Sequence, residues 1–95
     1  MIASFKCKET EKIWNGLHSR KFPGDMQNRA LRKLRQLDAS QTLNDLKNPP
    51  GNRLEPLKGD RIGQMSVRIN NQWRVCFVWE DRAAHNVEIA DYHWR

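Results

Sequence analysis

Five side chains in the second half of the sequence have types and spacing that suit chemistry on an anion. Arg68 and Arg74 are cations on two segments that read as adjacent strands, and Asp91, Tyr92 and His93 form a run near the C-terminus. An arginine inside an otherwise apolar strand needs a partner, which is either a carboxylate of the chain or an anion brought by a ligand. Carboxylate and imidazole groups can also transfer protons. The fold decides whether these side chains meet.

The strand that carries Arg74 is residues 73–79, which are apolar on both alternating faces apart from this arginine. Such a strand is typical of a sheet interior that is covered on both faces. Residues 65–69 alternate as a second strand, and the three-residue connector 70–72 predicts an antiparallel pair with Arg68 directly opposite Arg74. Like charges opposed in this way destabilise a sheet by about 1 kcal/mol. We therefore expect Arg74→Ala to leave the stability unchanged or to raise it.

A third strand is expected at residues 87–93, returning antiparallel after a loop over residues 80–85. The sequence does not determine the register of its pairing with residues 73–79, because both faces of those residues are apolar. The antiparallel arrangement brings the C-terminal acid, tyrosine and histidine beside the two arginines. The sequence thus predicts one mixed cluster at one end of the sheet.

Two helices are expected before these strands. Residues 1–5 read as a short strand, followed by a short helix for which Thr10 or a neighbour serves as the cap. The strongest helical pattern begins near Asp25, and its apolar stripe recurs at helical spacing through Leu37. This order predicts an α+β fold, a small antiparallel sheet with two N-terminal helices packed on one face, in a single domain over residues 1–95.

Two groups of basic residues have a functional and a structural interpretation of similar weight. The outer face of the second helix carries a cluster that either contacts RNA or a partner, or is simply solvated: Arg29, Arg32, Lys33 and Arg35. The loops before the sheet carry Arg53, Lys58 and Arg61 within nine residues, which either form an anion pocket or lie on a solvated turn.

Composition bounds the class of partner. The 95 residues include 17 Lys and Arg against 11 Asp and Glu, a net charge of +6. This points to a polyanion such as RNA, DNA or a ribosome, or to an acidic protein. A well-solvated basic surface is the alternative, and charge alone does not exclude it. Cys7 and Cys76 match no metal-ligand spacing and are interpreted as reduced thiols of a cytoplasmic protein. We expect no signal peptide, and no apolar run is long enough to cross a membrane.

Four stretches of the sequence together resemble HigB-type toxins of the RelE superfamily, which belong to bacterial type II toxin–antitoxin modules. They are residues 1–6, 50–61, 67–77 and 87–93, so the resemblance spans nearly the whole chain. The combination of Trp73-Arg74 with a terminal Asp91-Tyr92-His93 is its most specific part. The resemblance implies a RelE-like fold.

The resemblance also implies an mRNA endonuclease that works in the ribosomal decoding site and needs neither a metal nor another cofactor. A ribose 2′-OH attacks the adjacent phosphate, and the reaction asks for a base, an acid and cations. Carried over by position, Lys58 and Arg74 would hold the scissile phosphate. Asp91 and His93 would transfer protons, and Tyr92 would orient or stack a base. Arg53 and Arg61 are expected to bind RNA, and the register argument adds Arg68.

The implied partners are a HigA-like helix-turn-helix antitoxin, the ribosome with its mRNA, and operator DNA only through the antitoxin. One position departs from the family, because some relatives carry a histidine where this chain has Glu55, which is either a general base or an outward surface residue. The alternative function is a non-catalytic nucleic-acid-binding or antitoxin-interaction module with the same basic surface. Pure binding would not need the proton-transfer pair Asp91 and His93.

Overall fold

The chain folds into two α-helices, three short 3-10 helices and a four-stranded sheet, in a computed structural model that describes residues 1–92. The elements in chain order are α1 (Lys8–Trp14), α2 (Gly24–Ala39), η1 (Leu43–Lys47), η2 (Pro50–Asn52), β1 (Glu55–Pro56), η3 (Gly59–Arg61), β2 (Met65–Arg68), β3 (Trp73–Glu80) and β4 (Ala83–Asp91). The predicted α+β class is confirmed. Within the described residues, no helix has the length and apolar content needed to span a bilayer.

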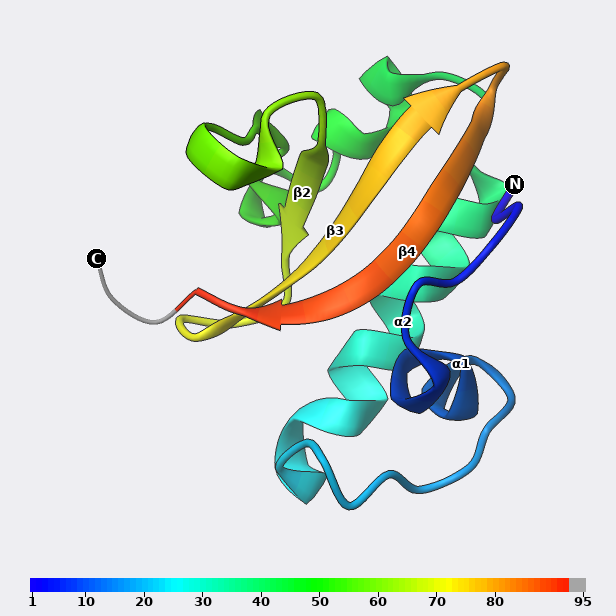
Figure 1. The fold of residues 1–95 in the computed structure, drawn as a ribbon, viewed down its shortest axis with the longest axis vertical. Coiled ribbons are helices and arrows are strands. Elements are labelled where there is room, and N and C mark those ends of the chain that lie inside the picture. The colour runs from blue at the N-terminus through cyan, green and yellow to red at the C-terminus, as the bar shows by residue number, and fades with distance from the viewer. Residues whose placement is uncertain (93–95) are drawn as a thin grey trace.

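The sheet is an antiparallel meander with strand order β1-β2-β3-β4 (Figure 1). β3 lies between β2 and β4, so the predicted interior strand is confirmed. The predicted register between β2 and β3 is confirmed too, with Arg68 opposite Arg74. On the other side of β3, Asp91 pairs with Trp73. One end of the sheet therefore holds both arginines and the C-terminal acid.

The connection between β3 and β4 is shorter than expected. Only Asp81 and Arg82 separate the strands, and both have positive φ, at 54° and 62°. Positive φ at both central residues is the backbone geometry that matches strand twist in a two-residue hairpin. The expected loop over residues 80–85 is therefore wrong, because Glu80 ends one strand and His85 lies in the next.

Both helices pack on the same side of the sheet (Figure 1). The apolar stripe of α2 is buried against strand residues in one core, which includes Met26, Ala30, Leu34, Leu37, Val67, Val75, Phe77 and Ile89. α2 begins at Gly24 and follows Pro23, so the predicted cap Asp25 lies in the first turn instead. Its charge still favours the positive end of the helix.

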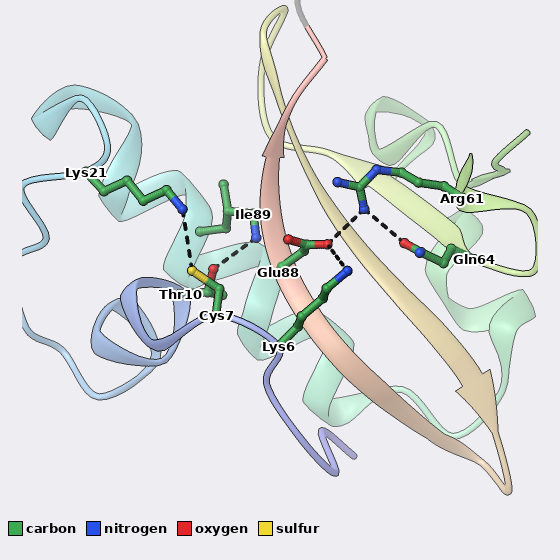
Figure 2. A network of polar contacts seen from close by, with 8 residues as sticks. All are labelled: Lys6, Cys7, Thr10, Lys21, Arg61, Gln64, Glu88 and Ile89. Atoms are coloured by element: carbon green, nitrogen blue, oxygen red, sulfur yellow. Dashed lines mark hydrogen bonds and ion pairs between the residues drawn. The ribbon is translucent and has the colours of Figure 1, made fainter. Parts of the chain in front are cut away.

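Thr10 has a different structural role from the predicted helix cap. Cys7 precedes α1, and Thr10 lies within the helix with none of its surface exposed. Its hydroxyl oxygen accepts a hydrogen bond from the backbone N–H of Ile89 at 3.0 Å (Figure 2). This buried hydrogen bond links α1 to β4.

The N-terminal segment runs along the outer edge of β4 rather than forming a regular strand (Figure 1). It makes two isolated parallel bridges, from Ile2 to Ala84 and from Phe5 to Val87. The backbone N–H of Ala3 donates to the Ala84 carbonyl oxygen at 2.8 Å. Residues 1–5 therefore form two isolated bridges instead of the expected strand.

The face of β3 that points away from the helices is also covered. Leu57, from the segment that links β1 and β2, forms a second small core with Cys76 and Ala90, and Tyr92 packs against it. Cys76 is completely buried, and burial raises the pKa of its thiol to about 11. Arg74 lies on this same covered face.

Candidate active site

Arg74 lies at the centre of the candidate site and is only 8% exposed. Its Nε donates a hydrogen bond to the Ser66 hydroxyl oxygen at 2.7 Å. Its Nη2 donates to the Arg53 carbonyl oxygen at 2.6 Å and to the Ser66 carbonyl oxygen at 3.3 Å. The close partners of the guanidinium are therefore neutral oxygens, which orient it without neutralising its charge.

The Arg53 carbonyl reaches Arg74 because the preceding loop is tightly held. Asn52 is fully buried, and its Nδ2 donates to the carbonyl oxygens of Leu46 and Asn48 at 3.1 and 3.2 Å. Arg53 follows in the left-handed conformation, with φ 45° and ψ 55°, directly after η2. This conformation turns the chain at Arg53, whose carbonyl accepts from the guanidinium.

The charge of Arg74 is only loosely balanced. Among residues 1–92, the nearest carboxylate oxygen is Glu55 Oε1, which is 3.7 Å from Arg74 Nη2, and the Glu55 side chain is 54% exposed. Burial lowers the pKa of Arg74, while the charge of Glu55 opposes that shift and Arg68 adds to it. An ion pair at this distance is weak when one of its partners is exposed, as Glu55 is here. The buried cation therefore retains the capacity to attract a further anion.

Two cavities adjoin one another over this part of the sheet. The smaller, of about 310 Å³, is lined by Arg53, Glu55, Arg68, Asn70, Asn71, Arg74 and Tyr92. The larger, of about 810 Å³, is lined by Glu55, Pro56, Leu57, Lys58, Asp60, Arg61, Asp91 and Tyr92. Because they share Glu55 and Tyr92, we call them together the active groove. The groove gathers every predicted site residue that the structure describes, and His93 lies outside the described residues.

The C-terminal part of the groove is fixed to the β2–β3 connection. Gln72 Nε2 donates to Asp91 Oδ2 at 3.2 Å, and the Tyr92 backbone N–H donates to the Gln72 carbonyl oxygen at 2.5 Å. Asn70 shapes the same connection, since its Oδ1 accepts from the backbone N–H groups of Gln72 and Trp73, both at 2.8 Å. The carboxylate is thereby held at the end of the sheet where Arg74 lies.

Comparison with known proteins identifies the family. Residues 3–93 match the model of the HigB-like toxins, described as RelE-like toxins of the type II toxin–antitoxin system HigB. The chain belongs to this family. It is 41% identical over 95 residues to Toxin HigB-1 of Vibrio cholerae, with 99% of this chain and 100% of that protein aligned.

A second relative and a solved structure agree with this assignment. The chain is 30% identical over 93 residues to Endoribonuclease HigB of Proteus vulgaris, covering 98% of this chain and 100% of that one. Its fold is similar to that of a YafQ mutant from E. coli, with a TM-score of 0.62, 14% identity and coverage of 97% and 94%. The RelE-like fold is thus confirmed, and as a type II toxin this HigB-like protein has a cognate antitoxin.

Lys58 and Arg61 of this HigB-like toxin differ in whether a carboxylate among residues 1–92 pairs with their charge. Lys58 is exposed, precedes η3 and lines the larger cavity. Arg61 lines the same cavity but donates to Glu88 Oε2 at 2.8 Å and to Gln64 Oε1 at 3.1 Å (Figure 2). The hydrogen bond to Glu88 raises the pKa of Arg61. The charge of Arg61 is therefore already matched within the chain.

Sequence reasoning missed two groups that hold Arg74, which are the Ser66 hydroxyl and the Arg53 carbonyl. Ser66 is the one small polar residue on a strand that is otherwise apolar or basic, and it shares the face of Arg68. That pattern could have indicated an acceptor for a neighbouring arginine. The Arg53 carbonyl had no such signal, because a backbone group carries no residue type. Across residues 1–92, no three His, Cys, Asp or Glu side chains are grouped to hold a metal ion.

Proposed function

We propose that the active groove cleaves messenger RNA on the ribosome by attack of a ribose 2′-OH on the adjacent phosphate. The observation that carries this proposal is the buried guanidinium of Arg74, oriented by neutral oxygens in a groove that Lys58, Glu55 and Asp91 also line. The printed name of the Proteus vulgaris relative, Endoribonuclease HigB, supports the reaction class. Mere binding of RNA would not need acidic side chains in a basic groove.

The reaction can be written from the groups that line the groove. A base removes the 2′-OH proton, the 2′ oxygen bonds to phosphorus, and the bond to the 5′ oxygen breaks as an acid protonates it. The products are a 2′,3′-cyclic phosphate and a 5′-OH. Negative charge grows on the equatorial phosphate oxygens in the transition state, so fixed cations such as Arg74 lower the barrier more than they tighten binding.

Individual roles follow from position and chemical type. Arg74 and Lys58 hold the scissile phosphate, while Asp91 and His93 transfer protons. Tyr92 lines both cavities of the groove, where an aromatic ring can stack on a base. Glu55 also lines both cavities, and its exposed carboxylate is a second candidate for the base.

The partners that accompany this function are a HigA-like antitoxin with a helix-turn-helix domain, and the ribosome that presents the message in the cytoplasm. Operator DNA is reached only through the antitoxin. A net charge of +6 supports association with an RNA-rich particle, because long-range attraction to phosphates speeds encounter.

The test is induction of the chain without its antitoxin, followed by mapping of mRNA 5′ ends. We expect growth arrest, and cuts with 5′-OH and cyclic-phosphate ends that disappear in an Arg74→Lys variant, since a point charge cannot reproduce the oriented fork of a guanidinium. Arg82→Lys is the matched control, because Arg82 lies in the β3–β4 turn. Arrest without RNA cuts would contradict the proposal and favour a non-catalytic binding module.

A further inference from the structure

A second group of cations lies outside the active groove, where α2 passes the end of β2. A cavity of about 310 Å³, here called the basic hollow, is lined by Arg29, Arg32, Lys33, Gln36, Gly51 and Arg68, and by the buried Ile69. Its α2 residues are spaced at i, i+3, i+4 and i+7, so they share one face of the helix. This face differs from the buried stripe that packs on the sheet.

No carboxylate lines the basic hollow, and none of its four cations makes an ion pair within residues 1–92. Two of them bond to amide oxygens instead. Lys33 Nζ donates to Asn52 Oδ1 at 2.5 Å, and Arg68 Nη2 donates to Asn71 Oδ1. Amide oxygens orient a cation but leave its charge, so repulsion within the cluster is not relieved by the chain.

The electrostatics of Lys33 reflect this crowding. Burial lowers the pKa of Lys33, and the charges of Arg32, Arg68 and Arg29 lower it further. A cluster of like charges in a partly desolvated hollow costs free energy in the free protein. Bound phosphates would remove that cost and release counterions from the nucleic acid.

Arg68 connects the two sites, because it lines both the basic hollow and the smaller cavity of the active groove. An RNA strand with one phosphate over Arg74 can continue past Arg68 to the cations of α2. We propose that the basic hollow is a second phosphodiester-binding subsite, which holds RNA backbone beyond the scissile phosphate. This inference rests on the proposed function, because it says along which side of the protein the message or the ribosomal RNA extends from the scissile phosphate.

An acidic segment of the antitoxin fits the hollow less well. Protein segments anchor through apolar side chains in desolvated pockets. The only apolar side chain of the hollow is Ile69, which is 3% exposed. Phosphodiesters need only cations and amide donors, which the hollow supplies. The phosphates can come from the message or from ribosomal RNA, and the experiment separates these sources.

The test variant combines Arg29→Gln with Arg32→Gln, and the control combines Arg35→Gln with Arg82→Gln. All four residues are exposed, and the control removes the same charge from α2 and the hairpin turn without touching the hollow. The probes are a single-stranded RNA with 2′-O-methyl groups, which cannot be cleaved, and purified ribosomes. Each is titrated over a series of salt concentrations, and thermal melts verify folding.

We expect the test variant to bind the RNA about tenfold more weakly than the control, with a salt slope smaller by about 0.7 for each lost contact. If only ribosome binding weakens, the phosphates are ribosomal and the subsite is still supported. An equal loss in both variants would overturn the inference, as would intact RNA and ribosome binding with loss of antitoxin binding. If the parent cuts RNA and the test variant has an unchanged KM, the second subsite is wrong but the proposed function stands. If the test variant binds RNA more weakly but the parent never cuts, the proposed function is wrong but the subsite stands.

Discussion

Arg74 bonds to Ser66, although the strand register places Arg74 opposite Arg68. The guanidinium leans along β2, and its Nε donates to the Ser66 hydroxyl oxygen at 2.7 Å in the protein interior. This diagonal contact explains how two opposed arginines are accommodated, because Arg68 instead turns to Asn71. It also changes what removal of Arg74 should do.

The first prediction is that Arg74→Ala abolishes RNA cleavage and also destabilises the fold. The substitution leaves the buried hydroxyl of Ser66 and the Arg53 carbonyl without their donor, which costs about 1–3 kcal/mol. Relief of repulsion from Arg68 is smaller, at about 1 kcal/mol or less. The expectation of unchanged stability, based on the strand register alone, therefore no longer follows. Urea unfolding of Arg74→Ala beside the parent checks this, and an equal or higher midpoint would restore the earlier expectation.

The second prediction concerns Ser66 as a positioning residue. Ser66→Ala should lower kcat about tenfold with little change in KM, because the guanidinium loses the acceptor that fixes its orientation. Ser66→Thr retains the hydroxyl acceptor and should keep most of kcat, which separates loss of the acceptor from general destabilisation. Equal losses of kcat in Ser66→Ala and Ser66→Thr would mean that Ser66 does not act through its hydroxyl.

The third prediction tests Glu55 as a base. Glu55→Gln should lower kcat about 100-fold, because an amide cannot accept the 2′-OH proton. The melting temperature should hardly change, since the Glu55 side chain is 54% exposed and its ion pair is long. Glu55→His is the matched variant, and it should recover activity because an imidazole can also accept a proton. Full kcat in Glu55→Gln would mean that this glutamate is only a surface residue.

The fourth prediction contrasts the two thiols. Cys7 lies 3.7 Å from Lys21 Nζ at the start of α1 (Figure 2). Burial would raise the pKa of Cys7, but backbone hydrogen bonds from Thr10 and Glu9 and the Lys21 charge together lower it. Iodoacetamide at pH 8 should therefore label Cys7 and spare Cys76, and both should react in denaturant. Comparable labelling of Cys76 in the folded protein would contradict the described core.

The fifth prediction is a loss of stability at alkaline pH. The unfolded Cys76 thiol ionises near 9.0, whereas burial raises its pKa in the folded protein to about 11. The stability contributed by this group is fully present below pH 9 and is lost as the pH rises towards 11. Two pKa units correspond to about 3 kcal/mol. The free energy of unfolding should fall less steeply over this range in Cys76→Ala, and identical slopes would count against the shift.

The sheet could be predicted because its signals are local. The alternation in residues 65–69 and the connector 70–72 set the register of β2 and β3, and the two apolar faces of β3 indicated its interior place. The sequence also predicts a strand at residues 1–5, but the pairing of this segment depends on β4, which lies about 80 residues later in the chain. Propensity over five residues does not encode such a contact.

The residue types of the site could be predicted, but their partners could not. The basic and acidic side chains of the groove stand out in the sequence, because charged residues near an apolar strand require explanation. Which oxygen accepts from Arg74 depends on a left-handed residue at Arg53 and on a fully buried Asn52 that anchors the loop. Thr10 was missed for the same reason, since its acceptor role exists only once α1 lies on β4.

The pairing of residues 2 and 5 with β4 joins segments of the chain that lie about 80 residues apart. Contacts this distant in sequence form slowly, because the entropy of closing the intervening loop is lost before the contact stabilises the fold. The same strand ends at Asp91, which lines the active groove. The N-terminal segment and the groove therefore depend on one strand, and both are completed only when β4 is in place.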